Sequence, residues 1–142
     1  MTSTRHATQK KTLDERLLHL TRNERSGLVA FVDRLRQRYG DDLQRVVLFG
    51  SKARGDFDDE SDLDLLVVVR MANGDYRQYW NEIVGIAWDT ELTYSTVTSL
   101  VIKDEVDYAT MREHQLLLAR NIERDGIELW TTQPSVPTFE SA

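Results

Sequence analysis

Two aspartates at the start of a predicted strand, Asp62 and Asp64, are the residues best suited to chemistry. They flank Leu63 and precede the apolar run 65–69, so we expect them at the edge of a core strand. Because side chains alternate along a strand, both carboxylates point to the same face. Two adjacent carboxylates repel each other, which raises the pKa of one of them, and a divalent cation removes the repulsion. Oxygen ligands of this kind suit Mg²⁺, which binds one or two carboxylates together with substrate phosphates.

The alternative is an acidic surface loop, because other acidic residues, Asp56, Asp58, Asp59 and Glu60, precede the pair. A lone Asp-x-Asp sequence is solvated surface in most proteins. The apolar residues around this pair favour the strand instead. Two carboxylates at the edge of a core strand then indicate a functional role.

A second candidate feature, Gly50-Ser51, follows the apolar run 45–49, which is predicted to be a buried strand. Glycine lets the chain turn sharply and lets backbone N–H groups approach a ligand, and the serine hydroxyl adds a donor. Such a turn can hold phosphate oxygens, although alone it is more often an ordinary turn. One feature ends a strand and the other opens the next, so both can meet at one end of the sheet as a site for a nucleoside triphosphate.

Capping-box patterns predict two helix starts, because Thr12 and Thr21 are each followed three residues later by glutamate. The further predicted elements are strands at 45–50 and 63–69, a helix at 75–88, a strand at 94–102, a helix at 105–122 and a short pairing segment at 127–130. This order is typical of a single α/β or α+β domain with helices against a sheet. The link between the first two strands lacks a clear helix, which favours a hairpin-like mixed sheet over a doubly wound one.

The chain of 142 residues has the length of one domain. We assign that domain to residues 12–130, with a disordered basic arm at 1–11 and a flexible tail at 131–142 that contains both prolines. Trp80, Trp88 and Trp130 are expected in the core or in an interface rather than stacked on a base.

Composition excludes several classes of function. The chain has no cysteine, so disulfides, thiolate zinc sites and thiol catalysis are impossible, and its 3 histidines are scattered. A net charge of −6 excludes a uniformly basic nucleic-acid binder and makes nucleic acid an unlikely direct ligand. No apolar run approaches the roughly 20 residues of a membrane span, and the N-terminus has no apolar signal core. The expected location is the cytoplasm.

The segment 46–69 resembles the signature of the DNA polymerase β-like nucleotidyltransferase superfamily, and within it the minimal nucleotidyltransferases (MNT). The residues that carry the resemblance are Gly50-Ser51-Lys52-Ala53-Arg54-Gly55 and Ser61-Asp62-Leu63-Asp64-Leu65. The resemblance implies an enzyme that transfers a nucleoside monophosphate from a nucleoside triphosphate to a hydroxyl group and releases pyrophosphate. The expected donor is ATP, so that AMP is the group transferred. By the same resemblance Gly50 and Ser51 hold the triphosphate, and Asp62 and Asp64 hold Mg²⁺ and are catalytic. Arg54 faces phosphate or braces the loop.

The family usually carries a third carboxylate on the next central strand, where it helps to deprotonate the acceptor hydroxyl. The predicted strand 94–102 has none. Glu91 lies just before it and would take the role if the strand began earlier. Asp104, Glu105 and Asp107 lie just after it, where capping or solvated roles are expected.

Several functions follow from the resemblance. The first is a nucleotidyltransferase that acts as the antitoxin of a small helical HEPN-type toxin, which would be both its partner and its acceptor. The second is a catalytically weak or inactive module of the same fold that neutralises a partner by binding. Aminoglycoside-type transferases, which carry an extra helical domain, and template-directed polymerases rank lower for a short acidic chain. The sequence leaves a homo-oligomer open.

Overall fold

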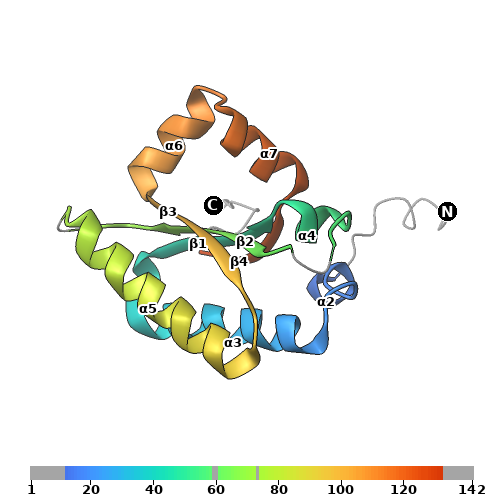
Figure 1. Ribbon diagram of the computed structural model, residues 1–142. Helices are drawn as coiled ribbons and strands as arrows, with labels where there is room; N and C mark the ends of the chain where they lie inside the picture. Colours follow the sequence, from blue (N-terminus) through green and yellow to red (C-terminus); the bar gives the residue numbers. More distant parts are fainter. Residues whose placement is uncertain (1–11, 59–60, 73, 133–142) are drawn as a thin grey trace, which may run out of the picture.

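The computed structural model describes residues 12–58, 61–72 and 74–132 (Figure 1). The helices are α2 (Leu13–Arg16), α3 (Arg22–Tyr39), α4 (Ser51–Arg54), α5 (Tyr76–Tyr94), α6 (Glu105–Glu113) and α7 (Leu117–Asp125), with a 3₁₀ turn η1 at Gly40–Asp42. The strands are β1 (Leu43–Phe49), β2 (Leu63–Val69), β3 (Thr98–Asp104) and β4 (Ile127–Thr131). Among the described residues, no helix is both long and apolar enough to cross a membrane.

The strands form one mixed sheet in the order β3-β2-β1-β4. β1 is antiparallel to both of its neighbours, β2 and β4, whereas β2 and β3 are parallel. This arrangement confirms the predicted mixed sheet, because the short link from β1 to β2 permits an antiparallel pair, and α5 supplies the crossover that a parallel pair requires. The end of β1 and the starts of β2 and β3 consequently lie at the same end of the sheet.

Helices cover both faces of this sheet: α3 and α5 lie on one face, and α6 and α7 on the other (Figure 1). The larger core lies under α3 and α5 and includes Leu63, Leu65 and Val67 of β2. The alternate β2 residues Leu66 and Val68 pack with a smaller cluster under α6 and α7. By this alternation the side chain of Asp64 belongs to the α6 and α7 face of the sheet.

Both predicted capping boxes are present. The hydroxyl of Thr12 accepts from the N–H of Glu15 at the start of α2, and that of Thr21 accepts from the N–H of Glu24 at the start of α3. In each case the glutamate side chain accepts from the backbone N–H of the threonine. Thus local sequence alone specified where α3 begins, and this start lies beside the candidate active site described below.

Several element boundaries differ from the prediction. Helix α5 runs to Tyr94 rather than ending at residue 88, so β3 begins at Thr98 instead of 94. The segment predicted as one helix at 105–122 is two helices, α6 and α7, separated by a turn in which Gln115 has a φ of 52°. At the far end, Thr131 is the last residue of β4. The predicted arm at 1–11, and the predicted tail from residue 133 onward, lie outside the described residues.

Candidate active site

The turn that leaves β1 packs directly against the start of β2. Phe49 pairs with Asp64 in the antiparallel register, and Gly50 follows Phe49 with a φ of 75°. A Cβ atom at Gly50 would lie 2.2 Å from Oδ2 of Asp64. Both the positive φ and this close approach require glycine, so the sequence brings the turn and the second aspartate together through a residue without a side chain.

A one-turn helix, α4, follows Gly50. The carbonyl of Gly50 accepts from the N–H groups of Ala53 and Arg54, which closes the turn. The N–H groups of Ser51 and Lys52 come first in the turn and therefore have no intrahelical acceptor. The sequence analysis treated this stretch as a polar link without a helix, because four residues are too few for a periodic pattern. These two N–H groups and the Ser51 hydroxyl are the donors that could receive phosphate oxygens.

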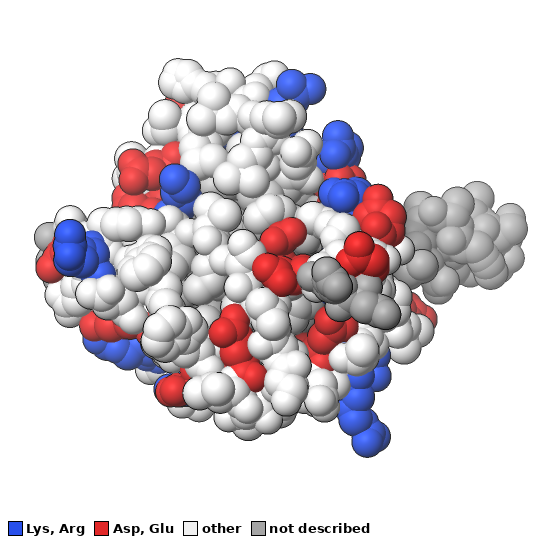
Figure 2. Space-filling view, in the orientation of Figure 1, with Lys and Arg blue, Asp and Glu red and all other residues white. Residues whose placement is uncertain are grey.

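The two aspartates differ in environment. Asp62 lies one residue before β2 and is exposed, whereas Asp64 lies within the strand and is half-buried. Burial raises the pKa of the Asp64 carboxyl, the negative charge of Asp62 raises it further, and the Arg54 guanidinium opposes both effects. The charges of Asp62 and Arg54 therefore both act on the Asp64 carboxyl. Figure 2 shows acidic side chains gathered on the front of the molecule.

Arg54 also braces the loop that follows α4. Its Nε donates to Oδ2 of Asp56 at 3.2 Å, and the side chain remains well exposed. Of the two roles expected for Arg54, the bracing contact is present, and the guanidinium stays close enough to Asp64 to act on its pKa.

The neighbouring cation, Lys52, turns away from the carboxylates. Its side chain is buried, and its ammonium forms an ion pair of 2.7 Å with Glu24 of α3 and lies 4.1 Å from the ring centre of Phe57. The backbone carbonyl of Lys52 contacts the ring of His19. Lys52 thus fastens α4 to the start of α3.

As predicted, the third strand carries no carboxylate beside the aspartate pair: its one acid, Asp104, is the last residue of β3, at the far end of the strand, where it caps α6. Glu91 is on α5, where its Oε2 accepts from both the N–H and the hydroxyl of Thr98, at 2.7 and 2.5 Å. The condition for Glu91 to act, an earlier start of the strand, is not met, and Glu91 instead joins the end of α5 to the start of β3. In the parallel register Ser99 lies beside Asp64. Ser99, a residue that the sequence analysis passed over, therefore occupies the place next to the aspartate pair.

A cavity of about 530 Å³ opens beside Asp62. The start of α3, the approach to β2 and the link from α5 to β3 line it with Thr21, Arg22, Asn23, Glu24, Ser61, Asp62, Ser95, Thr96 and Val97. All of these residues except Val97 carry a hydroxyl, amide or charged group in the side chain. The cavity could therefore receive a polar group next to the aspartate pair.

The donor set fits a divalent cation only in part. Among the residues that the structure describes, no cluster of three or more histidine, cysteine or acidic residues could hold a metal ion. Asp62 and Asp64 supply two hard oxygen ligands on neighbouring positions. That number matches the usual protein contribution to a Mg²⁺ site whose other ligands are substrate phosphates and water.

Comparison with known proteins places the chain in a family. The family model for polymerase β nucleotidyltransferases matches residues 33–135. The chain belongs to this nucleotidyltransferase family. A relative from Methanocaldococcus jannaschii with the assigned name protein adenylyltransferase MJ0604 is 31% identical over 83 residues, which are 58% of this chain and 76% of the relative.

A solved structure described as a minimal nucleotidyltransferase shows the same fold. It is 25% identical, has a TM-score of 0.51, and is matched over 78% of this chain and 98% of its own. A toxin–antitoxin structure with AMP-PNP has a TM-score of 0.48 at 23% identity, over 72% of this chain and 73% of its own.

Proposed function

We propose that the protein transfers AMP from ATP to a hydroxyl group on a second protein and releases pyrophosphate. The observation that carries this proposal is the contact between Gly50 and Asp64, because it joins a phosphate-binding turn to a carboxylate pair in one site. The family match supports nucleotidyl transfer. The assigned name of the archaeal relative supports adenylate as the group transferred and a protein as its acceptor.

The chemistry needs positioning and charge neutralisation more than covalent help. In the transfer, the acceptor oxygen bonds to the α-phosphorus of ATP, the bond from that phosphorus to pyrophosphate breaks, and the hydroxyl proton is lost. The N–H groups of Ser51 and Lys52 and the Ser51 hydroxyl would bind phosphate oxygens. Asp62 and Asp64 would hold Mg²⁺, which when bound supplies positive charge to the triphosphate. Arg54 would add positive charge at the same edge.

The cavity beside Asp62 has the polar lining that an acceptor loop carrying a hydroxyl would need, and it adjoins one of the two carboxylates. The resemblance to minimal nucleotidyltransferases suggests that the acceptor protein is a HEPN-type toxin. A neighbouring gene for a small helical protein with an Arg-x₄-His motif would strengthen that prediction.

Ser99 favours a second candidate function. A site with Ser99 rather than a carboxylate beside Asp64 lacks a base for the acceptor hydroxyl at that position. Such a protein could bind a nucleotide and a partner while transferring slowly or not at all. It would then neutralise the partner by contact.

Label transfer separates the two functions. The protein is incubated with Mg²⁺, each of the four nucleoside triphosphates labelled at the α-phosphate, and either host lysate or the product of the neighbouring gene. We expect ATP to label a protein band, Asp64→Asn to abolish the label, and Glu113→Gln, which changes an exposed acid on α6, to retain it. If no acceptor is labelled and Asp64→Asn still binds and neutralises the partner, the contact function replaces the enzymatic one.

A further inference from the structure

An apolar stripe runs along the outer side of α5. Tyr76, Trp80, Val84, Trp88 and Leu92 follow one another at intervals of four residues, which places them on one continuous ridge of the helix. Trp88 is 66% exposed and Leu92 is 83% exposed, while Tyr76 and Trp80 are 45% and 43% exposed. Trp80 and Trp88 were predicted to lie in the core or in an interface. Their exposure excludes the core, so that an interface is the alternative that remains.

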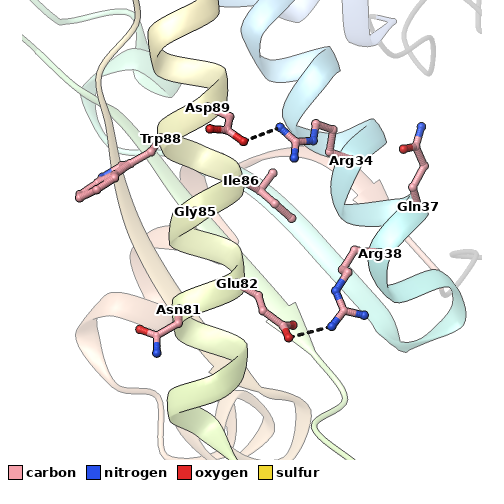
Figure 3. A pocket seen from close by; sticks show the side chains of 9 residues that line it. All are labelled: Arg34, Gln37, Arg38, Asn81, Glu82, Gly85, Ile86, Trp88 and Asp89. Carbon is pink, nitrogen blue, oxygen red and sulfur yellow. Dashed lines mark hydrogen bonds and ion pairs between the residues drawn. The ribbon is translucent and has the colours of Figure 1, made fainter.

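The C-terminal half of the stripe is turned away from the rest of the molecule, whereas Val84 packs partly against the main core and the hydroxyl of Tyr76 donates to the carbonyl of Ile102 in β3. On its other side α5 packs against α3, where the ion pairs Arg34–Asp89 and Arg38–Glu82 bridge the two helices at 3.2 and 2.7 Å. Figure 3 shows Trp88 pointing away from α3 and from these pairs. The part of the chain that the structure describes therefore leaves a line of large aromatic and aliphatic side chains in contact with water.

We propose that α5 is the interface of a homodimer, in which the stripe packs against the same stripe of a second copy. When the helix of a second copy runs antiparallel to the first, residues at equal distances on either side of Val84 face each other. A two-fold axis at Val84 sets Trp80 against Trp88 of the second copy and Tyr76 against Leu92 of the second copy. A two-fold interface requires this kind of self-complementary surface, whereas an unrelated partner does not.

The charged residues beside the stripe also favour a second copy of the chain as its partner. Arg77 adjoins the stripe at its first residue, and Glu91 adjoins it at its last. The same axis at Val84 sets Arg77 of one copy against Glu91 of the other, on both sides of the contact. Arg77 is exposed and has no ion pair with any residue that the structure describes. Glu91 is half-buried and uses its Oε2 for Thr98. An antiparallel pair of helices thus brings opposite charges together at each end.

Packing geometry and area are sufficient. Ridges of residues four apart interdigitate when two helices cross at about 50°. With aromatic side chains that present about 150–250 Å² each, the stripe offers roughly 500 Å² per copy. Two copies then bury about 1,000 Å² from the stripe alone, which is the lower limit for a specific interface.

Light scattering coupled to size-exclusion chromatography tests the dimer across a range of protein concentrations. We expect the full chain to be dimeric at micromolar concentration and Trp88→Glu to be monomeric while it keeps a cooperative unfolding transition, with an unfolding temperature that no longer depends on protein concentration. Val106→Glu on α6 is the matched control, because Val106 is also 66% exposed but lies away from α5, and it should stay dimeric. A monomeric wild-type chain, or a Trp88→Glu variant that remains dimeric, would overturn the proposal.

Two further variants test the axis itself. The chain has no cysteine, so Val84→Cys introduces a single thiol at the proposed axis, and oxidation should link two copies there but not in Val106→Cys. Arg77→Glu alone should weaken the dimer at least tenfold, and mixing Arg77→Glu with Glu91→Arg should restore a heterodimer in which opposite charges meet again. Failure of both the link and the rescue would mean that the stripe serves another protein.

Discussion

At the scale of single residues, the site depends on Gly50, because any side chain at this position would collide with the carboxylate of Asp64. Gly50 allows the turn to lie against Asp64, and burial together with the negative charge of Asp62 raises the pKa of Asp64 and disfavours its ionised form. An ionised Asp64 therefore costs stability near neutral pH. Sites that bind charged ligands often carry such a cost, because the arrangement suits the ligand rather than the unliganded fold.

Gly50→Ala should damage the site far more than the same change at another left-handed glycine. The new Cβ would meet the Asp64 carboxylate, so we expect a loss of nucleotide binding and a destabilisation of more than about 1–2 kcal/mol, the usual cost of a left-handed non-glycine residue. Gly74 has a φ of 72° but no atom within 4 Å of an added Cβ, so Gly74→Ala isolates the backbone cost. Urea unfolding and nucleotide titration measure both; equal losses in the two variants would contradict the contact.

Ser99→Asp should change the rate of transfer, because Ser99 lies beside Asp64 in the register of β2 and β3. A positioned general base contributes about 10²–10⁴-fold, so a carboxylate here should raise the rate of AMP transfer by one or more orders of magnitude. Ser99→Asn, which has the same shape without the charge, is the control and should not. Single-turnover label transfer with saturating ATP and Mg²⁺ gives the rates. A wild-type rate equal to that of Ser99→Asp would show that transfer does not need a carboxylate at this position.

At the scale of elements, the predictable parts are those whose signals are local. The capping threonines specified the helix starts, and the β-branched runs specified β1 and β2. The end of α5 was missed because its last turns are rich in threonine, which usually indicates a strand. In the structure Thr90 and Thr93 donate their hydroxyl groups to helix carbonyls four residues earlier, which satisfies them within the helix. The break between α6 and α7 was missed because no glycine or proline marks it in the sequence. The packing of both helices on the sheet imposes it instead.

The buried pair Lys52–Glu24, which joins α4 to α3, should be worth more than an exposed pair. Removing one partner of a buried pair costs about 3–5 kcal/mol, so Lys52→Met should be strongly destabilised at pH 7. Arg34→Met, which breaks the exposed pair with Asp89, should lose about 1 kcal/mol or less. Chemical unfolding at pH 7 checks both. An equal loss in the two variants would contradict the role of Lys52.

The pH dependence of the same pair has a definite sign. Burial raises the pKa of Glu24, but its hydrogen bonds to Lys52 and Thr21 and the charge of Lys52 outweigh that effect and bring the pKa below its ordinary 4.5. A carboxyl with a lowered folded pKa adds stability above its unfolded pKa, and this stability is lost as the pH falls through the folded pKa. The difference in the free energy of unfolding between wild type and Lys52→Met should therefore become smaller below about pH 4.5 and stay constant near neutral pH.

At the scale of the whole molecule, the parts of the site come from segments far apart in the chain. The end of β1, the starts of β2 and β3 and the start of α3 all meet at one end of the sheet. The sequence predicted the first two of these, since both lie within one continuous motif. It could not place Ser99 or the start of α3 there, because only the parallel register and the packing of α3 bring them in.

Because these segments are held together by tertiary contacts, a ligand that bridges them should stabilise the entire fold. A ligand that binds only the folded state adds about 2.7 kcal/mol at a concentration 100 times its Kd. We expect a non-hydrolysable ATP analogue with Mg²⁺ to raise the unfolding temperature by several degrees, and EDTA to reverse most of the gain, because two neighbouring carboxylates repel an uncompensated triphosphate. Asp64→Asn should lose the response to Mg²⁺, whereas Glu113→Gln should keep it. Stabilisation by the analogue that is unaffected by EDTA and by Asp64→Asn would place the nucleotide elsewhere on the protein.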